Sequence, residues 1–346
     1  MNEFDRRGAG KQFSRIGWGV FTFLAVSLVV QEAFILLLEI VGRSDLTQEG
    51  WFLIVFSEVS MYAFGFPACL AIMKNRPAPA IAPGPKLSAG EFISFFCMTI
   101  TVTYAFNIFG NILMQIVSNL LGTTIDNPLD SLLDGTSLWL QLFTILIIAP
   151  FMEEFIFRKC VVTSLAKYSH RAAIVVSGLS FGLVHGNFYQ FFYAAAIGML
   201  FAYIYLRTGR LRYTIALHFL VNFFGGAVPL LLQTNIPAIA DLESFENFGE
   251  MIDFFQNNIW KLIPYLGYLF FMGGIAITGF VLLIVKRKSF RLSLDCPAIP
   301  RGRAFQTVFV NSGMIVMILL GLLIFALNIF QPMIVELLQH LKYGQF

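Results

Sequence analysis

Nine apolar stretches follow one another along this chain, and short polar segments separate them. They cover approximately residues 16–41, 51–73, 91–121, 138–157, 172–187, 188–206, 213–232, 260–285 and 305–330. An α-helix needs about 20 apolar residues to cross the hydrocarbon layer of a bilayer, and most of these stretches have that length. A transmembrane barrel would instead show alternating segments of about 10 residues, which this sequence lacks. The pattern therefore predicts an all-α fold, a polytopic transmembrane helical bundle of about nine spans.

The composition excludes an ordinary soluble protein. Hydrophobic residues make up 58% of the 346 residues and charged residues only 12%, whereas soluble domains have about 45–50% and about 25%. The net charge of +3 gives no reason to expect a nucleic-acid partner. The four cysteines are scattered without a CxxC pair, which argues against a disulfide framework or a cysteine-ligated metal. The expected surroundings of the chain are a lipid bilayer.

The basic residues fall almost wholly on one side of a nine-span arrangement. With the N-terminus inside, the inner segments carry 20 of the 23 Lys and Arg residues, and the outer segments keep only Arg43, Lys261 and Lys342. Because basic loops stay in the cytoplasm, we expect a cytoplasmic N-terminus and an outer C-terminus. The basic N-terminal segment and its apolar run resemble a signal peptide, but the run is too long and lacks a small-residue cleavage site. The sequence favours a multi-pass protein of a bacterial plasma (inner) membrane.

The polar segments suggest four regions. We expect an accessory transmembrane hairpin with a Pro-rich inner linker (1–90), a core (91–232), an acidic outer loop with a short amphipathic helix (233–259) and C-terminal transmembrane helices (260–346). No repeat of 20–50 residues and no glycine-rich phosphate loop occurs in the sequence. The chemistry must therefore come from polar residues within the apolar spans.

Ionisable residues inside apolar spans are costly, so each one needs a reason. Glu154 and Arg158, in APFMEEFIFRKC, are four residues apart and can pair on one helix face. Glu153 points about 100° away and is free for another role. One carboxylate held by arginine beside a free one suits general-base catalysis. A helix end in the headgroup region would explain the same string equally well.

Two further spans carry polar residues at helical spacing. Phe181 and His185 share a face in SFGLVHGNF, and His218 and Asn222 share one in ALHFLVNFF. Taken singly, the first pair indicates a core histidine, and the second suits interhelical hydrogen bonds as well as a site. Taken together, two histidines, a glutamate and an amide could bind a metal or activate water beside an oxyanion donor. No HExxH motif is present, which excludes a zincin site.

These three motifs, in this order and on separate apolar segments, resemble the signature of the CPBP family, which includes the CAAX prenyl proteases and the bacteriocin-processing (Abi) proteins. The resemblance covers about residues 138–232. It implies an intramembrane protease core, with the catalytic residues Glu153, His185, His218 and Asn222. Glu153 and His185 would activate water, and His218 and Asn222 would stabilise the oxyanion, while Glu154, Arg158 and Phe181 would be supporting residues.

The resemblance leaves the cofactor open. Glu153, His185 and His218 are the candidate ligands if a divalent metal such as zinc takes part. The expected function is an intramembrane endopeptidase that hydrolyses membrane-embedded or lipid-associated peptides near the inner leaflet, in a cavity that opens inward.

Two other classes of function remain as alternatives. A non-catalytic protein of the same fold, for self-immunity or scaffolding, would not need Glu153. A proton-coupled transporter would show an inverted repeat with broken helices, which the sequence does not show. Three more acidic residues, Glu32, Glu39 and Glu58, lie in the first two spans. They suit interfacial carboxylates or a second polar patch, and no motif decides between the two.

Overall fold

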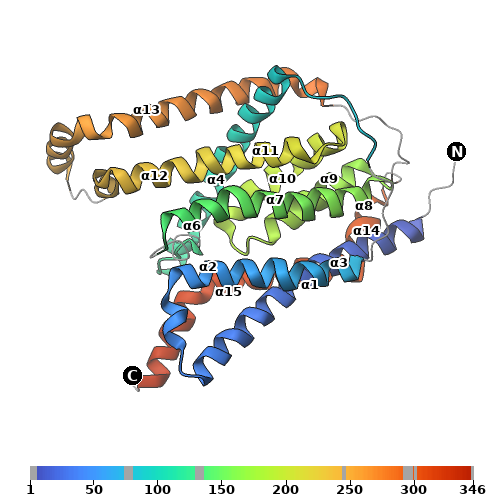
Figure 1. Ribbon diagram of the computed structural model, residues 1–346, viewed down its shortest axis with the longest axis horizontal. Coiled ribbons are helices and arrows are strands. Elements are labelled where there is room, and N and C mark those ends of the chain that lie inside the picture. Colours follow the sequence, from blue (N-terminus) through green and yellow to red (C-terminus); the bar gives the residue numbers. More distant parts are fainter. Residues whose placement is uncertain are drawn as a thin grey trace.

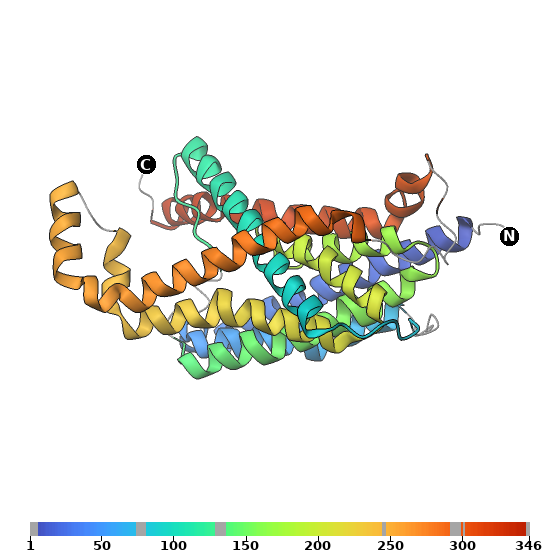
Figure 2. The same ribbon diagram turned by 90° about the horizontal axis from the view of Figure 1, so that it is seen from above.

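A computed structural model describes residues 6–73, 81–128, 136–243, 247–290, 299 and 302–343 of the chain. Within these ranges the regular structure is helical throughout. Among the described residues, eight helices are long and apolar enough to cross a membrane, and a shorter apolar helix accompanies them. The expected all-α transmembrane bundle is confirmed, and Figures 1 and 2 show its helices running lengthwise from one end of the molecule to the other.

The elements follow the predicted stretches closely. The first spans are α1 (Arg6–Ile40) and the run α2 (Gly50–Val59), η2 (Ser60–Gly65) and α3 (Phe66–Met73). Next come α4 (Ala89–Leu121) and the run α6 (Leu138–Phe143), η3 (Thr144–Ile148), α7 (Ala149–Glu154), η4 (Phe155–Val162) and α8 (Thr163–Ala166). They are followed by α9 (His170–Leu183), α10 (Phe188–Thr208) and the run α11 (Leu211–Asn222), η5 (Phe223–Ala227) and α12 (Val228–Asn235). The last are α13 (Phe248–Lys286), α14 (Ala304–Phe309) and α15 (Ser312–Tyr343).

Two helix boundaries in this part of the chain differ from the prediction. The expected span 172–187 is the 14-residue helix α9, about 21 Å long at 1.5 Å per residue, which is too short to cross alone. The chain turns at Gly186, whose φ is 71°, and Asn187 caps α10 by accepting from the backbone N–H of Gln190. The fourth span continues to Ala166 instead of ending at 157, because Arg158 is buried in the bundle and does not mark a helix end.

The other differences lie near the C-terminal half. A break between α14 and α15 divides the expected span 305–330, where the Asn311 side chain accepts from the backbone N–H of Met314. The segment 233–259 contains a 3-10 turn, Pro237–Glu243, and its last residues already belong to α13. The short outer helix expected there is thus continuous with the following span.

The centre of the bundle is a hairpin of α9 and α10, packed against α4 and η4. Glycines allow its two helices to approach closely: a Cβ on Gly178 would come within 2.6 Å of the Ala195 carbonyl oxygen, and one on Gly182 within 2.8 Å of the Phe191 carbonyl oxygen. In this region the core side chains of Phe157, Phe181 and Phe201 are almost completely buried. The hairpin therefore places residues near its turn beside those of α7 and α11.

The accessory helices surround this centre on both sides. The first helix, α1, packs against α3, η2 and α15, and α13 crosses α4 at Gly279, where the Thr101 hydroxyl donates to the Ala276 carbonyl. Figure 1 shows α1, α2 and α15 at one edge of the bundle and α13 at the opposite edge. In the same view, α1 begins and α15 ends at opposite ends of the bundle.

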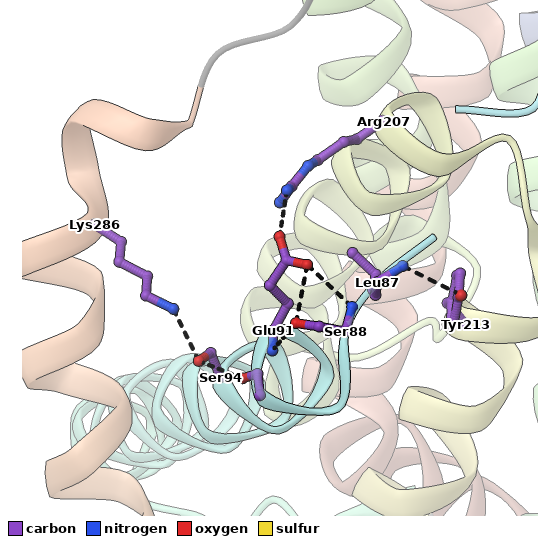
Figure 3. A network of polar contacts seen from close by, with 8 residues as sticks. Leu87, Ser88, Glu91, Ser94, Arg207, Tyr213 and Lys286 are labelled. Carbon is purple, nitrogen blue, oxygen red and sulfur yellow. Dashed lines mark hydrogen bonds and ion pairs between the residues drawn. The ribbon is translucent and has the colours of Figure 1, made fainter. Parts of the chain in front are cut away.

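A polar network joins four helices at the end where the basic segments lie (Figure 3). Ser88 and Glu91 form a capping box at the start of α4, and Glu91 also forms an ion pair with Arg207 of α10. Lys286 of α13 donates to Ser94, and the Tyr213 hydroxyl of α11 accepts from the backbone N–H of Leu87. These contacts fix the ends of α4, α10, α11 and α13 relative to one another.

Candidate active site

Glu154 and Arg158 form a buried ion pair beneath the candidate site. Their side chains are completely buried, and Arg158 Nε lies 3.1 Å from Glu154 Oε2. The guanidinium group also lies 4.6 Å from the ring centre of Phe181 and 5.4 Å from that of Phe201. A charge without solvent needs such a partner, and aromatic faces attract a cation. The pair therefore neutralises itself and leaves Glu153 as the separate carboxylate of this helix.

His218 connects the two glutamates. Its Nδ1 atom lies 3.0 Å from Glu154 Oε1, and its Nε2 atom lies 3.5 Å from Glu153 Oε2. The Glu153 side chain is 15% exposed, whereas that of Glu154 is not exposed at all. Because an ionised carboxylate only accepts hydrogen bonds, the proton on His218 Nδ1 points to Glu154 and the Nε2 edge faces Glu153.

His185 is oriented by the backbone of its own helix. Its Nδ1 atom lies 2.7 Å from the Phe181 carbonyl oxygen. A carbonyl can only accept, so Nδ1 carries the proton and Nε2 of the neutral ring is free to accept a hydrogen bond. The Phe181 ring packs edge-on against both histidines, at centre distances of 5.0 Å for His185 and 5.8 Å for His218. Phe181 thereby links the two imidazoles and the arginine.

Asn222 is held by an irregularity in the neighbouring helix. Its Nδ2 atom donates to the Ile145 carbonyl oxygen at 2.8 Å, and Ile145 belongs to the π-helical segment η3. A π-helical turn interrupts the usual hydrogen-bond pattern, which can free a carbonyl for another donor. The bond uses one of the two amide N–H groups and fixes the direction of the other.

All four candidate catalytic residues line one cavity of about 560 Å³. The supporting residue Phe181 lines it as well, while Glu154 and Arg158 lie behind its wall. Three lining residues that no motif indicated, Asn107, Asn111 and Glu58, add polar groups to it. Only their position inside apolar stretches could have pointed to them.

With the orientation that the positive-inside rule predicts, the direction of this cavity differs from the expected inward opening. Its lining begins on α4 at Thr103, ends on α10 at Ile197, and runs along α11 and α12 from His218 to Leu230. It therefore extends from His218 away from the end where the basic segments lie. Buried Glu154, Arg158, Phe157 and Phe201 close the side toward that end. The helix α11 begins at Leu211, at the end where the basic segments lie. His218 is seven residues further along, about 10 Å from that end.

A metal-binding arrangement is not formed by the candidate ligands. Across the described residues, no group of three or more His, Cys, Asp and Glu side chains is placed to hold a metal ion. The Nδ1 atom of His185 is engaged by the Phe181 carbonyl and that of His218 by Glu154. The expected divalent metal, such as zinc, at Glu153, His185 and His218 therefore stays a prediction.

Comparisons with known proteins agree with the motifs. Residues 135–224 match the family "Rce1-like: Type II CAAX prenyl endopeptidase Rce1-like". The resemblance to the CPBP family is confirmed. The matched residues run from the start of α6 past Asn222, and so include all three motifs.

One curated relative matches a longer part of the chain. A Bacillus subtilis (strain 168) protein named "Putative membrane peptidase YdiL" is 29% identical over 174 residues, which cover 46% of this chain and 67% of the relative. No solved structure matches the chain. The apolar helices indicate a multi-pass membrane protein, and both matches are to peptidase sequences.

Proposed function

We propose that this protein is an intramembrane endopeptidase that hydrolyses peptide bonds of membrane-associated substrates with water activated by Glu153. The observation that carries the proposal is the unequal environment of two adjacent carboxylates. Glu154 is fully buried and paired with Arg158 and His218, while Glu153 lines the cavity and is partly exposed. Carboxylates in such different surroundings take different roles, one structural and one in proton transfer.

In the proposed reaction Glu153 accepts a proton from a water molecule as the water oxygen bonds to the carbonyl carbon of the substrate. His185 Nε2 helps to orient that water. The free N–H of Asn222 and the Nε2 edge of His218 face the developing oxyanion, a role that requires a proton on His218 Nε2. Collapse of the tetrahedral intermediate breaks the C–N bond, and Glu153 returns the proton to the leaving amine.

The location of the reaction follows from the cavity. The basic ends of the helices mark the cytoplasmic side by the positive-inside rule, which gives a cytoplasmic N-terminus and an outer C-terminus in a bacterial plasma membrane. The cavity extends toward the other end of the helices, so the substrate reaches Glu153 from the outer half of the bilayer. This replaces the inner leaflet as the proposed place of cleavage.

Isotope labelling tests hydrolysis without knowledge of the natural substrate. The full chain in lipid nanodiscs is incubated with a library of hydrophobic peptides in H₂¹⁸O, and the products are sequenced by mass spectrometry. We expect new C-termini that carry one ¹⁸O atom, because the attacking oxygen comes from water. The absence of any new terminus with the wild-type chain would favour the non-catalytic alternative. Elemental analysis of the same preparation tests the predicted zinc.

A further inference from the structure

A second glutamate lines the cavity, and it belongs to the accessory hairpin. Glu58 lies near the end of α2 and lines the cavity together with Glu153. Its Oε2 atom is buried and makes no hydrogen bond with any described residue. The other two glutamates of this hairpin, Glu32 and Glu39, have exposed side chains and do not line the cavity.

The described lining of the cavity contains no Lys or Arg that could pair with this carboxylate. Among the described lining residues the titratable acids and bases, apart from tyrosines, are Glu58, Glu153, His185 and His218, with no Lys or Arg. The nearby Arg158 is already paired with Glu154 behind the wall. A carboxylate removed from water is costly unless a cation or hydrogen-bond donor accompanies it. No described residue supplies a cation or a hydrogen-bond donor to Glu58 Oε2. A bound molecule can supply one of the two.

Glu58 also lies on the route that the cavity defines. It is eight residues after Gly50, about 12 Å from the end of α2 that is remote from the basic segments. Amide side chains of Asn107, Asn111 and Gln190 line the same cavity and can bind the backbone of an extended peptide. A substrate that enters from this end can reach Glu58 and Glu153 together.

A helix irregularity follows Glu58, as it follows the Glu153–Glu154 pair and Asn222. The π-helical segment η2 begins at Ser60, two residues after Glu58. Similarly, η4 begins directly after Glu154 and η5 directly after Asn222. Such segments often occur at functional sites, where they redirect side chains. This shared feature is an argument independent of charge that Glu58 belongs to the site.

We propose that Glu58 forms a subsite for a cationic side chain, lysine or arginine, of the peptide substrate. The inference rests on the proposed function and specifies the substrate class of the same cavity. An ion pair with the bound peptide would compensate the buried carboxylate and orient the peptide relative to Glu153. Charge complementarity of this kind contributes to specificity.

Binding to a non-hydrolysing chain tests the subsite separately from cleavage. The full chain with Glu153→Gln, in nanodiscs, is titrated with a fluorescein-labelled Leu/Ala peptide of 12 residues that has one central lysine. Its twin carries Nε-acetyl-lysine at that position. We expect the lysine peptide to bind about tenfold more tightly, a difference of about one decade in Kd. Adding Glu58→Gln should reduce this preference to less than about twofold.

Further variants separate the possible outcomes. Glu58→Asp should keep most of the preference, and the matched control Glu32→Gln, on α1, should keep all of it. Equal binding of the two peptides before Glu58 is changed, or a preference that survives Glu58→Gln, would overturn the subsite. So would a preference that appears only after EDTA treatment, because a metal ion would then be the cation that pairs with Glu58. The isotope experiment above does not depend on Glu58, so each proposal can fail alone.

Discussion

His218 connects the buried ion pair to the candidate catalytic carboxylate. Its Nδ1 edge is fixed by buried Glu154, and its Nε2 edge faces Glu153 in the cavity. Glu154 in turn depends on Arg158, and the aromatic rings of Phe181 and Phe201 cover that arginine. The orientation of one imidazole therefore depends on an ion pair that does not reach the cavity.

Glu154→Gln should destabilise the protein because it leaves Arg158 charged and without its ionised partner. Removal of one member of a buried ion pair typically costs about 3–5 kcal/mol of unfolding free energy. Arg158→Gln in the Glu154→Gln background should recover part of that loss. Thermal unfolding in detergent measures both variants. A Glu154→Gln protein with the wild-type unfolding temperature would show that the pair contributes no stability.

The candidate site residues could be named from the sequence, whereas their surroundings could not. The spacing of four residues places Glu154 with Arg158 and His218 with Asn222 on shared helix faces, a local property of any helix. The contact between His218 and Glu154 joins residues 64 positions apart and depends on packing. Glu58 comes from another helix, and no motif accompanies it, so only the fold shows that it lines the cavity.

At the scale of helices, irregular turns accompany the site. The π-helical segments η3 and η4 flank Glu153 and Glu154, and η5 follows Asn222. The sequence predicted continuous helices here because hydrophobic periodicity is too coarse to locate one extra residue in a turn. The prediction of helix lengths had the same limitation. In the sequence Arg158 resembled the end of a helix, but it is buried and lies within a longer helix.

The crossing of α4 and α13 depends on a glycine. A Cβ at Gly279 would come within 2.0 Å of the Cys97 carbonyl oxygen, whereas one at Gly274 of the same helix meets nothing within 4 Å. Gly279→Ala should therefore destabilise the protein by about 1–3 kcal/mol, since overpacking forces a backbone shift. Gly274→Ala is the matched control and should be neutral or slightly stabilising. Equal unfolding temperatures for the two variants would contradict this crossing.

At the scale of the whole molecule, the arrangement of helices determines which end of the bundle gives access to the site. The cavity lining extends away from the basic ends, and large buried side chains close the other direction. The depth of individual residues in their spans did not predict this, because the direction of a cavity depends on which side chains fill the space between helices. The proposed access from the outer half of the bilayer thus depends on the orientation of the chain.

Cysteine labelling tests that orientation. Glu49 and Lys86 have exposed side chains and lie on opposite sides of the span Gly50–Met73. In a background with Ser at the native cysteines, Lys86→Cys should react with a membrane-impermeant maleimide only after the cells are permeabilised. Glu49→Cys should react in intact cells. The reverse pattern would place the cavity toward the cytoplasm, and equal labelling of both would contradict the span itself.

The central claim is that Glu153 transfers the proton, and Glu153→Gln tests it most directly. Glutamine keeps the shape and the hydrogen bonds of glutamate but cannot accept the proton, and loss of such a group typically lowers the rate by 10²–10⁴-fold. The measurement is the rate of ¹⁸O-labelled product formation by wild-type and Glu153→Gln protein in nanodiscs, with the unfolding temperature of each preparation measured in parallel. We predict a rate lowered by at least about 100-fold and an unfolding temperature nearly unchanged, because the Glu153 side chain lines the cavity and is not part of the buried ion pair. A Glu153→Gln protein that cleaves at the wild-type rate would contradict the account.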